Sequence, residues 1–558
     1  MAIIETIINE GRSATRHPPI MNRATTTFTR RETAASCGHI AKGPVIAIRA
    51  SRAAETRRAG GSQKVGFNSV IRFRISALGI ACALAATAVL AEQAAAGERS
   101  VSSAALPQDT APPAMGDYKS DFLADIEARK SYGIPAAEIF GFDFLLNEFN
   151  RHFVGDEYKS NLSSIRHNLR SSWRTDTDPF TINQLGHPYQ GSMYYGFARS
   201  AGLNYWESLG YTVTGSAFWE IAGETTPPSL NDQITTGFGG SFLGEALFRM
   251  SNLVIEKANM PPFWREVSAA AISPPTGLNR LAFGERFDHI FSSHDPIYYG
   301  RLALGVSTTA QNQVGPSTKL KHTEALADFS LDYGLPGKPG YTYNRPFDYF
   351  TFQATISSAN GFENLMTRGL LVGSDYEAGK NYRGVWGLYG TYDYIEPQTF
   401  RVSSTGLSLG TTAQWWLSRS VALQGSALMG AGYAAVGTVN GTADNDYHFG
   451  IAPQALISLR LIFADRASID TTAREYFVSR IGGVDRAGHD NIIRMDAAFT
   501  VRLYRQHAVA IRYLLSRRDT YSPNLGDRSQ TSGTIGLFYT FLGNDGFGAV
   551  EWRDSGSH

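Results

Sequence analysis

Four ionisable side chains between residues 187 and 232 have types that could support catalysis or metal binding. Glu220 and Glu224 are four residues apart, so they share one face if this stretch is helical. His187 and Asp232 would add one imidazole and a third carboxylate. Such a set could hold a metal ion or exchange protons as an acid/base cluster. The same side chains could instead form buried hydrogen bonds that fix helices, or simply face water.

Established motifs do not decide between these chemistries. The sequence has no His-Glu-x-x-His metal signature, nucleotide-binding glycine loop, Cys/His cluster or haem motif, so we assign no cofactor and leave the metal unknown. A Gly-x-Ser-x-Gly pattern occurs at 406–410, inside a predicted strand with no helix after it. A serine nucleophile needs a sharp strand-to-helix turn at this motif. We therefore interpret this copy as coincidental.

The candidate residues lie in a segment with helical spacing. Apolar residues recur about every four positions in two series, Tyr194, Ala198, Ala201 and Tyr205, and Phe238, Phe242, Ala246, Met250 and Val254. This spacing predicts two or three packed helices. Charged residues interrupt the apolar sequence, so no apolar stretch without a charge is long enough to cross a membrane. We expect residues 119–290 to form a mostly helical domain in the periplasm, inside a barrel as a plug, or along the membrane surface.

Two short sequence motifs within this segment are distinctive. They are Asn-Gln-Leu-Gly-His-Pro-Tyr at 183–189 and Pro-Ser-Leu-Asn-Asp at 228–232. Here the chain resembles the bacterial family known as domain of unknown function 3943, over roughly residues 170–280. The resemblance implies a bacterial envelope protein and brings no mechanism with it.

From 297 to 541 the sequence alternates apolar and polar residues with period two. In one run Phe350, Phe352 and Ala354 alternate with Thr351 and Gln353. Successive strand side chains point to opposite faces, so each run has an apolar and a polar face. The strands are expected near 297–308, 322–334, 347–358, 365–375, 382–394, 401–413, 420–434, 446–461, 466–477, 490–503, 507–517 and 529–541.

The strand lengths favour a membrane barrel over a soluble periplasmic β-domain. Most predicted strands exceed the ~9–11 residues that cross a bilayer at a tilt. An open sheet edge is costly in lipid, so we predict a closed antiparallel outer-membrane β-barrel of about twelve strands, with both ends in the periplasm. Charges gather on the polar faces, at Glu324, Asp328 and Asp332, at Arg494, Asp496 and Arg502, and at Asp470 and Arg474.

Residues 70–96 have the parts of a secretory signal peptide. Arg72 and Arg74 precede an apolar stretch from 75 to 91, and Ala94-Ala95-Ala96 offers small residues for cleavage. We expect residues 1–69 to be absent from the native protein, through a start site placed too far upstream, or disordered if they are made. Residues 97–118 are expected to form a linker and 542–558 a tail.

Charge and composition limit the classes of molecule that this protein could bind. Residues 1–96 hold 13 of the 51 basic and 5 of the 50 acidic residues, which leaves 38 basic and 45 acidic residues after cleavage. This acidic balance argues against nucleic acid as a partner. We expect outer-membrane lipid, possible small solutes or lipids, and the barrel-insertion machinery. The favoured function is non-enzymatic passage, binding or envelope upkeep. The alternative is an envelope enzyme that hydrolyses lipid or glycan with His187, Glu220, Glu224 and Asp232.

Overall fold

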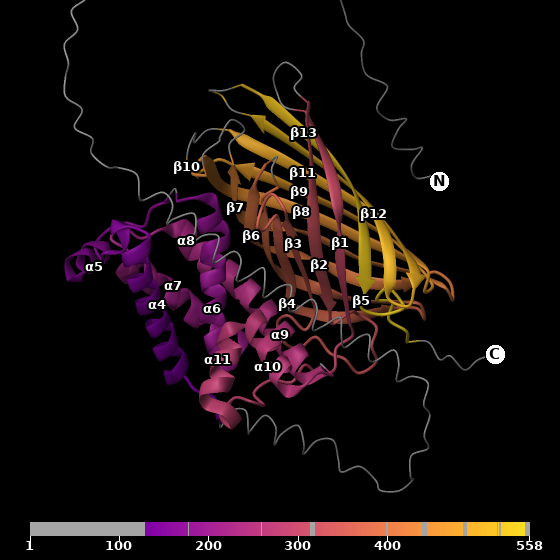
Figure 1. Cartoon of the computed structure of the whole chain (residues 1–558), viewed down its shortest axis with the longest axis horizontal. Helices are drawn as coiled ribbons and strands as arrows, with labels where there is room; N and C mark the ends of the chain where they lie inside the picture. The colour runs from indigo at the N-terminus through magenta and orange to yellow at the C-terminus, as the bar shows by residue number, and fades with distance from the viewer. Residues whose placement is uncertain are drawn as a thin grey trace, which may run out of the picture. The chain divides into compact units, whose positions relative to one another are not determined.

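The computed structural model describes residues 129–552 except 177, 258, 313–318, 398–399, 438–443, 484–487, 522 and 524–525. The predicted signal peptide at 70–96 and the residues before it lie outside the described part of the chain. Within the described part, helices α4–α11 precede a barrel of antiparallel strands (Figure 1). No helix there combines the length and apolarity needed to cross a membrane.

Twelve antiparallel strands close into a barrel, which confirms the predicted architecture. Each strand pairs with the next long strand along the chain, and β1 pairs with β13 to complete the circle. The two-residue strand β10 (Gly482–Gly483) adds only to β8. The twelve are β1 (Tyr298–Asn312), β2 (Lys319–Tyr333), β3 (Phe350–Ser357), β4 (Asn364–Ala378), β5 (Tyr382–Ile395), β6 (Val402–Trp416), β7 (Val421–Gly437), β8 (Tyr447–Phe463), β9 (Ala467–Ser479), β11 (His489–Tyr504), β12 (His507–Tyr521) and β13 (Arg528–Leu542).

The two ends of the barrel differ in their connections. At the end where β1 begins and β13 ends, four connections span two to four residues, 379–381, 417–420, 464–466 and 505–506. We call this the short-turn end. At the opposite, long-loop end, the connections span six to nine residues. Short turns on one side and longer loops on the other are typical of outer-membrane barrels. The connection 334–349 is the long exception at the short-turn end.

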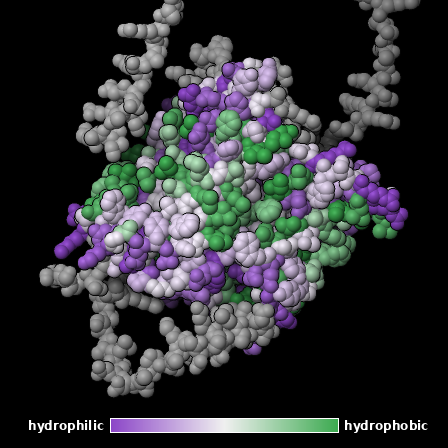
Figure 2. Space-filling view, turned by 180° about the vertical axis from the view of Figure 1, so that it is seen from behind, coloured by the Kyte–Doolittle hydropathy of each residue, from purple (hydrophilic) through white to green (hydrophobic). Residues whose placement is uncertain are grey.

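The strand alternation sorts polar from apolar side chains across the wall. In β8, Gln454, Ser458 and Arg460 point into the lumen, whereas Ile457 and Leu459 point outward and are exposed. Large exposed apolar residues lie on the outer face around the barrel, among them Leu304, Leu409, Met429, Phe499, Ile511 and Leu537. Figure 2 shows hydrophobic patches on the face of the molecule opposite to that of Figure 1.

The helical region, residues 133–286, contains more helices than the sequence suggests. Its α-helices are α4 (Gly133–Phe153), α5 (Leu162–Asn168), α6 (His187–Ser200), α7 (Tyr205–Phe218), α8 (Leu230–Ile234), α9 (Gly240–Lys257), α10 (Pro262–Ile272) and α11 (Pro274–Phe283). Short 3₁₀ turns η1 (Asp156–Tyr158) and η5 (Gly284–Arg286) accompany them. Three π-helical segments also occur, η2 (Ile182–Gly186), η3 (Trp219–Gly223) and η4 (Thr235–Gly239).

The helical region packs against the outer face of the barrel wall. In β5, Asp393 lines a lumen cavity, so its neighbours Tyr392 and Tyr394 point outward. Tyr392 donates from its hydroxyl to the Gln184 carbonyl at 2.6 Å, and the Phe180 ring stacks on Tyr394 at 5.9 Å. These residues belong to one buried hydrophobic core that joins α6 and α9 to the outward faces of β2–β5, β7 and β8. The helices therefore contact the wall from outside.

The lumen at the short-turn end is filled by two segments of the chain itself. Residues 543–552 follow the last strand, and their Phe547 and Val550 pack with Leu335 and Tyr341 of connection 334–349. The lumen-facing Gln414 donates to the Val550 carbonyl at 2.7 Å, and Gln424 donates to the Gly548 carbonyl at 2.7 Å. The C-terminal residues thus close this end from inside.

Candidate functional site

Three π-helical turns surround the residues singled out from the sequence. His187 directly follows η2, Glu220 lies within η3, and Asp232 lies in α8 just before η4. An additional residue in a helical turn shifts the side chains that follow, and such turns are frequent at functional sites. Spacing alone could not reveal them, because a π-turn breaks the regular helical period on which the sequence prediction relied.

The structure brings the four predicted residues together, with two further aspartates, at the start of α8. We call His187, Glu220, Glu224, Asp232, Asp176 and Asp178 the acidic cluster. The imidazole Nε2 of His187 lies 4.0 Å from the Oδ2 of Asp232, and both side chains are buried. Glu220 Oε2 accepts a hydrogen bond of 2.8 Å from the Ser229 amide. Ser229 caps α8 by accepting from the Asp232 amide.

Neutral amides bridge the carboxylates of the acidic cluster. Asn231 donates to both Asp176 and Asp232 at 2.9 Å, and Asn183 donates to Asp176 at 2.5 Å. Asn183 also donates to the Tyr447 hydroxyl of β8 at 2.8 Å, which ties the cluster to the barrel wall. The cluster is thus a hydrogen-bonded network whose donors are mostly uncharged.

Glu224 occupies the more open edge of this network. Its Oε1 accepts from the Trp219 indole at 2.9 Å, and its Oε2 accepts from the Thr226 hydroxyl at 3.0 Å. Burial, with Asp178 and Asp176 nearby, raises the pKa of Glu224 from 4.5 to about 7. Burial also raises the pKa of Asp178 from 3.8 to about 7. A carboxyl with a pKa near neutrality can both give and take a proton.

The same physical causes raise the pKa values of the two deepest carboxyls of the cluster. Burial and the neighbouring Glu224 raise the pKa of Glu220 well above its usual range. Burial and the neighbouring Asp176 do the same to the pKa of Asp232. Desolvation penalises the charged form, and adjacent carboxylates repel it further. Among the described residues, no three His, Cys, Asp or Glu side chains are placed to hold a metal ion.

A second buried polar cluster lies between α6, α9 and the connection 334–349. Glu245 accepts from Arg199 Nε at 2.7 Å and from Arg249 Nε at 2.8 Å, and Arg249 Nη1 donates to Asp348 at 3.0 Å. We call these four residues the arginine-paired cluster. Although burial opposes it, the two arginines hold the pKa of Glu245 below its usual value. The sequence analysis did not single out this cluster, because its members come from three separate segments.

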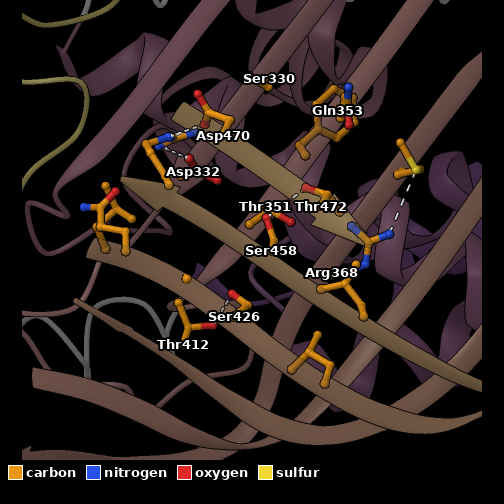
Figure 3. A pocket seen from close by; sticks show the side chains of 18 of the residues that line it. Ser330, Asp332, Thr351, Gln353, Arg368, Thr412, Ser426, Ser458, Asp470 and Thr472 are labelled. Atoms are coloured by element: carbon orange, nitrogen blue, oxygen red, sulfur yellow. Dashed lines mark hydrogen bonds and ion pairs between the residues drawn. The ribbon is translucent and has the colours of Figure 1, made fainter. Parts of the chain in front are cut away.

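The barrel lumen contains a cavity of about 140 Å³. Its polar side chains come from many strands and converge on the same space, among them Asp332, Thr351, Thr412, Ser458, Asp470 and Thr472 (Figure 3). Leu335 and Pro336 of the connection 334–349 line it at the short-turn end. Neighbouring cavities of about 50 and 20 Å³ share Arg512 and Arg474 with it, respectively.

Charges cross-link the walls of this lumen. Arg460 donates to Asp470 at 2.7 Å and to Asp332 at 3.0 Å, across the barrel from β8 to β2. Arg301 of β1 also pairs with Asp470, at 3.2 Å. The charged faces expected from the sequence at Asp328, Asp332, Asp470, Arg474, Arg494 and Asp496 therefore do face the lumen. Ser408 of the Gly-x-Ser-x-Gly pattern lies buried within β6 with no helix after it.

Comparison with known families matches the helical segment. The model of the family described as domain of unknown function (DUF3943) matches residues 172–275, which contain the acidic cluster and all three π-helical turns. The chain therefore carries a segment of this kind, as the motifs at 183–189 and 228–232 indicate. No curated protein sequence matches the chain.

Comparison with solved structures returns outer-membrane barrels. The outer membrane channel DcaP of Acinetobacter baumannii is 7% identical over 44% of this chain and 96% of that chain, with a TM-score of 0.21. The translocator domain of the autotransporter NalP from Neisseria meningitidis is 12% identical over 44% of this chain and 89% of that chain, with a TM-score of 0.22. At such TM-scores these likenesses carry no argument, and the barrel assignment rests on the strand pairing.

Proposed function

We propose that the chain is a non-enzymatic outer-membrane barrel that binds small solutes in its lumen and lets them pass. The observation that carries this proposal is a closed twelve-strand wall with a polar, charged interior and exposed apolar residues outside. Apolar side chains outside and polar ones inside match what lipid and a solute path require. On this proposal, the short-turn end, with the N- and C-terminal ends of the barrel, faces the periplasm.

The C-terminal residues 543–552 would control passage, because they fill the lumen at the periplasmic end. Trp552 donates from its indole to the Lys380 carbonyl at 3.1 Å and packs edge-on against Trp416 at 6.2 Å. Deleting 543–558 should raise the single-channel conductance of the protein in planar bilayers above that of the full chain. The matched control is Trp415→Ala, since Trp415 is next to Trp416 but exposed on the wall. Absence of conductance from both the full and the shortened chain would refute passage.

A charged substitution at an exposed apolar residue of the outer wall tests membrane insertion. Leu409 lies in the middle of β6 and is 63% exposed, and an arginine there would enter the hydrocarbon region. Leu409→Arg should destabilise the inserted barrel by about 2–4 kcal/mol, the usual effect near a bilayer midplane. Leu281→Arg is the control, because Leu281 is 86% exposed on helix α11 rather than on the barrel. Equal, small effects of the two substitutions would argue against a lipid-facing wall.

A second candidate function is an acid/base hydrolase of envelope lipid or glycan. The observation that favours it is the acidic cluster, in which Glu224 has a pKa of about 7 beside Asp178 and Asp176, and His187 lies 4.0 Å from Asp232. His187→Ala and Glu220→Gln should then abolish a mass change in envelope lipids or glycans that cells expressing the wild-type chain show. Glu148→Gln, at a partly exposed position of α4, is the control. Full retention of that change in both folded variants would refute the hydrolase.

A further inference from the structure

The ion pairs of the lumen leave two arginines without a partner. Arg301 and Arg460 pair with Asp470, Arg368 pairs with Asp393, and Arg512 pairs with Asp496 and Asp328. Arg474 and Arg494, by contrast, form no ion pair or hydrogen bond with any residue that the structure describes. The aspartates nearest to Arg474 are already engaged, since Asp393 also accepts from the Tyr476 hydroxyl at 2.8 Å.

These two arginines face one another across neighbouring strands. Arg474 of β9 and Arg494 of β11 are direct partners in the antiparallel register. Directly opposed residues have Cβ atoms about 4.5–5.5 Å apart, and like charges at such positions are destabilising. A barrel that only needed a stable wall would place a carboxylate opposite one of them, as Asp496 is placed beside Arg512.

Arg494 is buried, Arg474 is partly exposed, and both side chains line cavities inside the barrel. Arg494 is 6% exposed, its Nη1 is buried without a partner, and it lines the cavity of about 50 Å³. Arg474 has a buried Nε without a partner and lines the main cavity. Burying an unpaired charge is expensive, so the site is built to be completed by a negative group.

We propose that Arg474 and Arg494 form a binding site for a small oxyanion, such as phosphate, sulfate or a carboxylate, in the barrel lumen. A guanidinium is planar, always charged and able to donate two parallel hydrogen bonds to a carboxylate or phosphate. An anion between the two groups would supply acceptors for the orphaned donors and cancel their mutual repulsion. The inference rests on the proposed function only for the route by which the anion enters.

The cavity beside Arg494 reaches toward the long-loop end of the barrel. The cavity that Arg494 lines extends to Pro397, in the connection 396–401 between β5 and β6. Hydroxyl donors line it, from Ser307, Thr309, Thr355, Ser516, Ser532 and Thr534. The carboxyls of Glu324 and Glu363 line it as well, each with one buried oxygen that accepts no hydrogen bond. Arg512 borders both this cavity and the main one, which Arg474 lines.

The test is calorimetric titration of the refolded, detergent-solubilised chain with inorganic phosphate, sulfate and acetate in separate arms. Saturable binding of at least one of these anions is expected. The double substitution Arg474→Gln/Arg494→Gln should weaken it by about tenfold or more, because hydrogen bonds to charged groups are lost. Arg517→Gln is the matched control, since Arg517 is an exposed arginine of β12 that pairs with Asp519 on the same strand. It should leave the affinity unchanged.

Heat-modifiable gel migration of each variant establishes that the barrel is folded before titration. Equal affinity in the wild type and the folded double variant would overturn the site, and so would the absence of saturable binding by the wild type. Bilayer conductance reports separately on passage. Anion binding without conductance would support the anion site and refute passage through the lumen. Conductance without anion binding would support passage and refute the anion site.

Discussion

The acidic cluster and the arginine-paired cluster are two buried polar groups in one helical region. They differ in whether cationic side chains neutralise their carboxylates. Glu245 is buried between Arg199 and Arg249, and its charge is matched on both sides. Glu220 and Asp232 are equally buried, yet their direct donors are a backbone amide and the Asn231 amide. The first cluster carries ionised groups at neutral pH. In the second, burial raises the pKa of the deepest carboxyls well above their usual range.

The contrast separates a carboxylate paired with two arginines from carboxyls whose donors are neutral amides. A fully paired buried charge is a poor binding group for a ligand, because its hydrogen-bonding atoms already have partners. A buried carboxyl without a cation keeps a displaced pKa, which is the usual signature of a functional site. The lumen repeats the contrast, since most of its arginines are paired and the opposed Arg474 and Arg494 are not.

The strongest test of this comparison removes the shared anion of the arginine-paired cluster. Glu245→Gln preserves the shape of the side chain but leaves Arg199 and Arg249 buried beside a neutral amide. We expect a loss of about 3–5 kcal/mol in the free energy of unfolding, as for other broken buried ion pairs. Thermal unfolding of the detergent-solubilised protein measures it. A loss below about 1 kcal/mol would show that the pairing is not structural.

Helix packing can be separated from charge at Gly191 of α6, which lies between the His187 and Arg199 ends of that helix. A Cβ at Gly191 would approach the Thr236 carbonyl oxygen to 2.0 Å, so η4 would have to move. Gly191→Ala should cost about 1–3 kcal/mol through overpacking. Gly210→Ala in α7, with nothing within 4 Å of the added Cβ, should instead stabilise by up to about 1 kcal/mol. Equal effects at the two sites would contradict the tight contact between α6 and η4.

The pH dependence of stability distinguishes the clusters further. The folded-state pKa of Glu224 is raised from 4.5 to about 7, so this carboxyl contributes stability at pH values below about 4.5. That contribution declines as the pH rises through about 7, because the unfolded chain then releases a proton that the folded chain retains. The unfolding temperature should therefore fall across this window, and Glu224→Gln should flatten the fall. An unchanged profile in the variant would exclude Glu224 as the titrating group.

The smallest expected change in the unfolding free energy is that of Asp232→Asn. Burial raises the pKa of Asp232 and so favours its neutral form, and Asp232→Asn should therefore change the unfolding free energy by no more than about 1 kcal/mol. The same substitution should abolish any hydrolase activity that depends on this carboxyl. A large loss of stability from Asp232→Asn, similar to that of Glu245→Gln, would remove the distinction between the clusters.

Much of the barrel could be predicted because its signal is local. Alternation in runs such as Phe350, Thr351 and Phe352 depends only on neighbouring residues, and it located all twelve long strands. The candidate residues His187, Glu220, Glu224 and Asp232 could be chosen by type and spacing, and the structure brings them together. Asp176 and Asp178 were overlooked as members of that cluster, since their approach depends on how the chain enters α6.

The sequence by itself determined the strands, their two faces and the helical character of the segment before them, because periodicity is a property of short stretches. Only the tertiary structure decided which charges are matched. Glu245 meets Arg199 through helix packing, and Arg474 meets Arg494 through strand register. Tertiary structure also decided that the helices lie against the outside of the wall and that the C-terminal residues fill the lumen. These are contacts between distant segments, and their energies depend on geometry that no single stretch of sequence encodes.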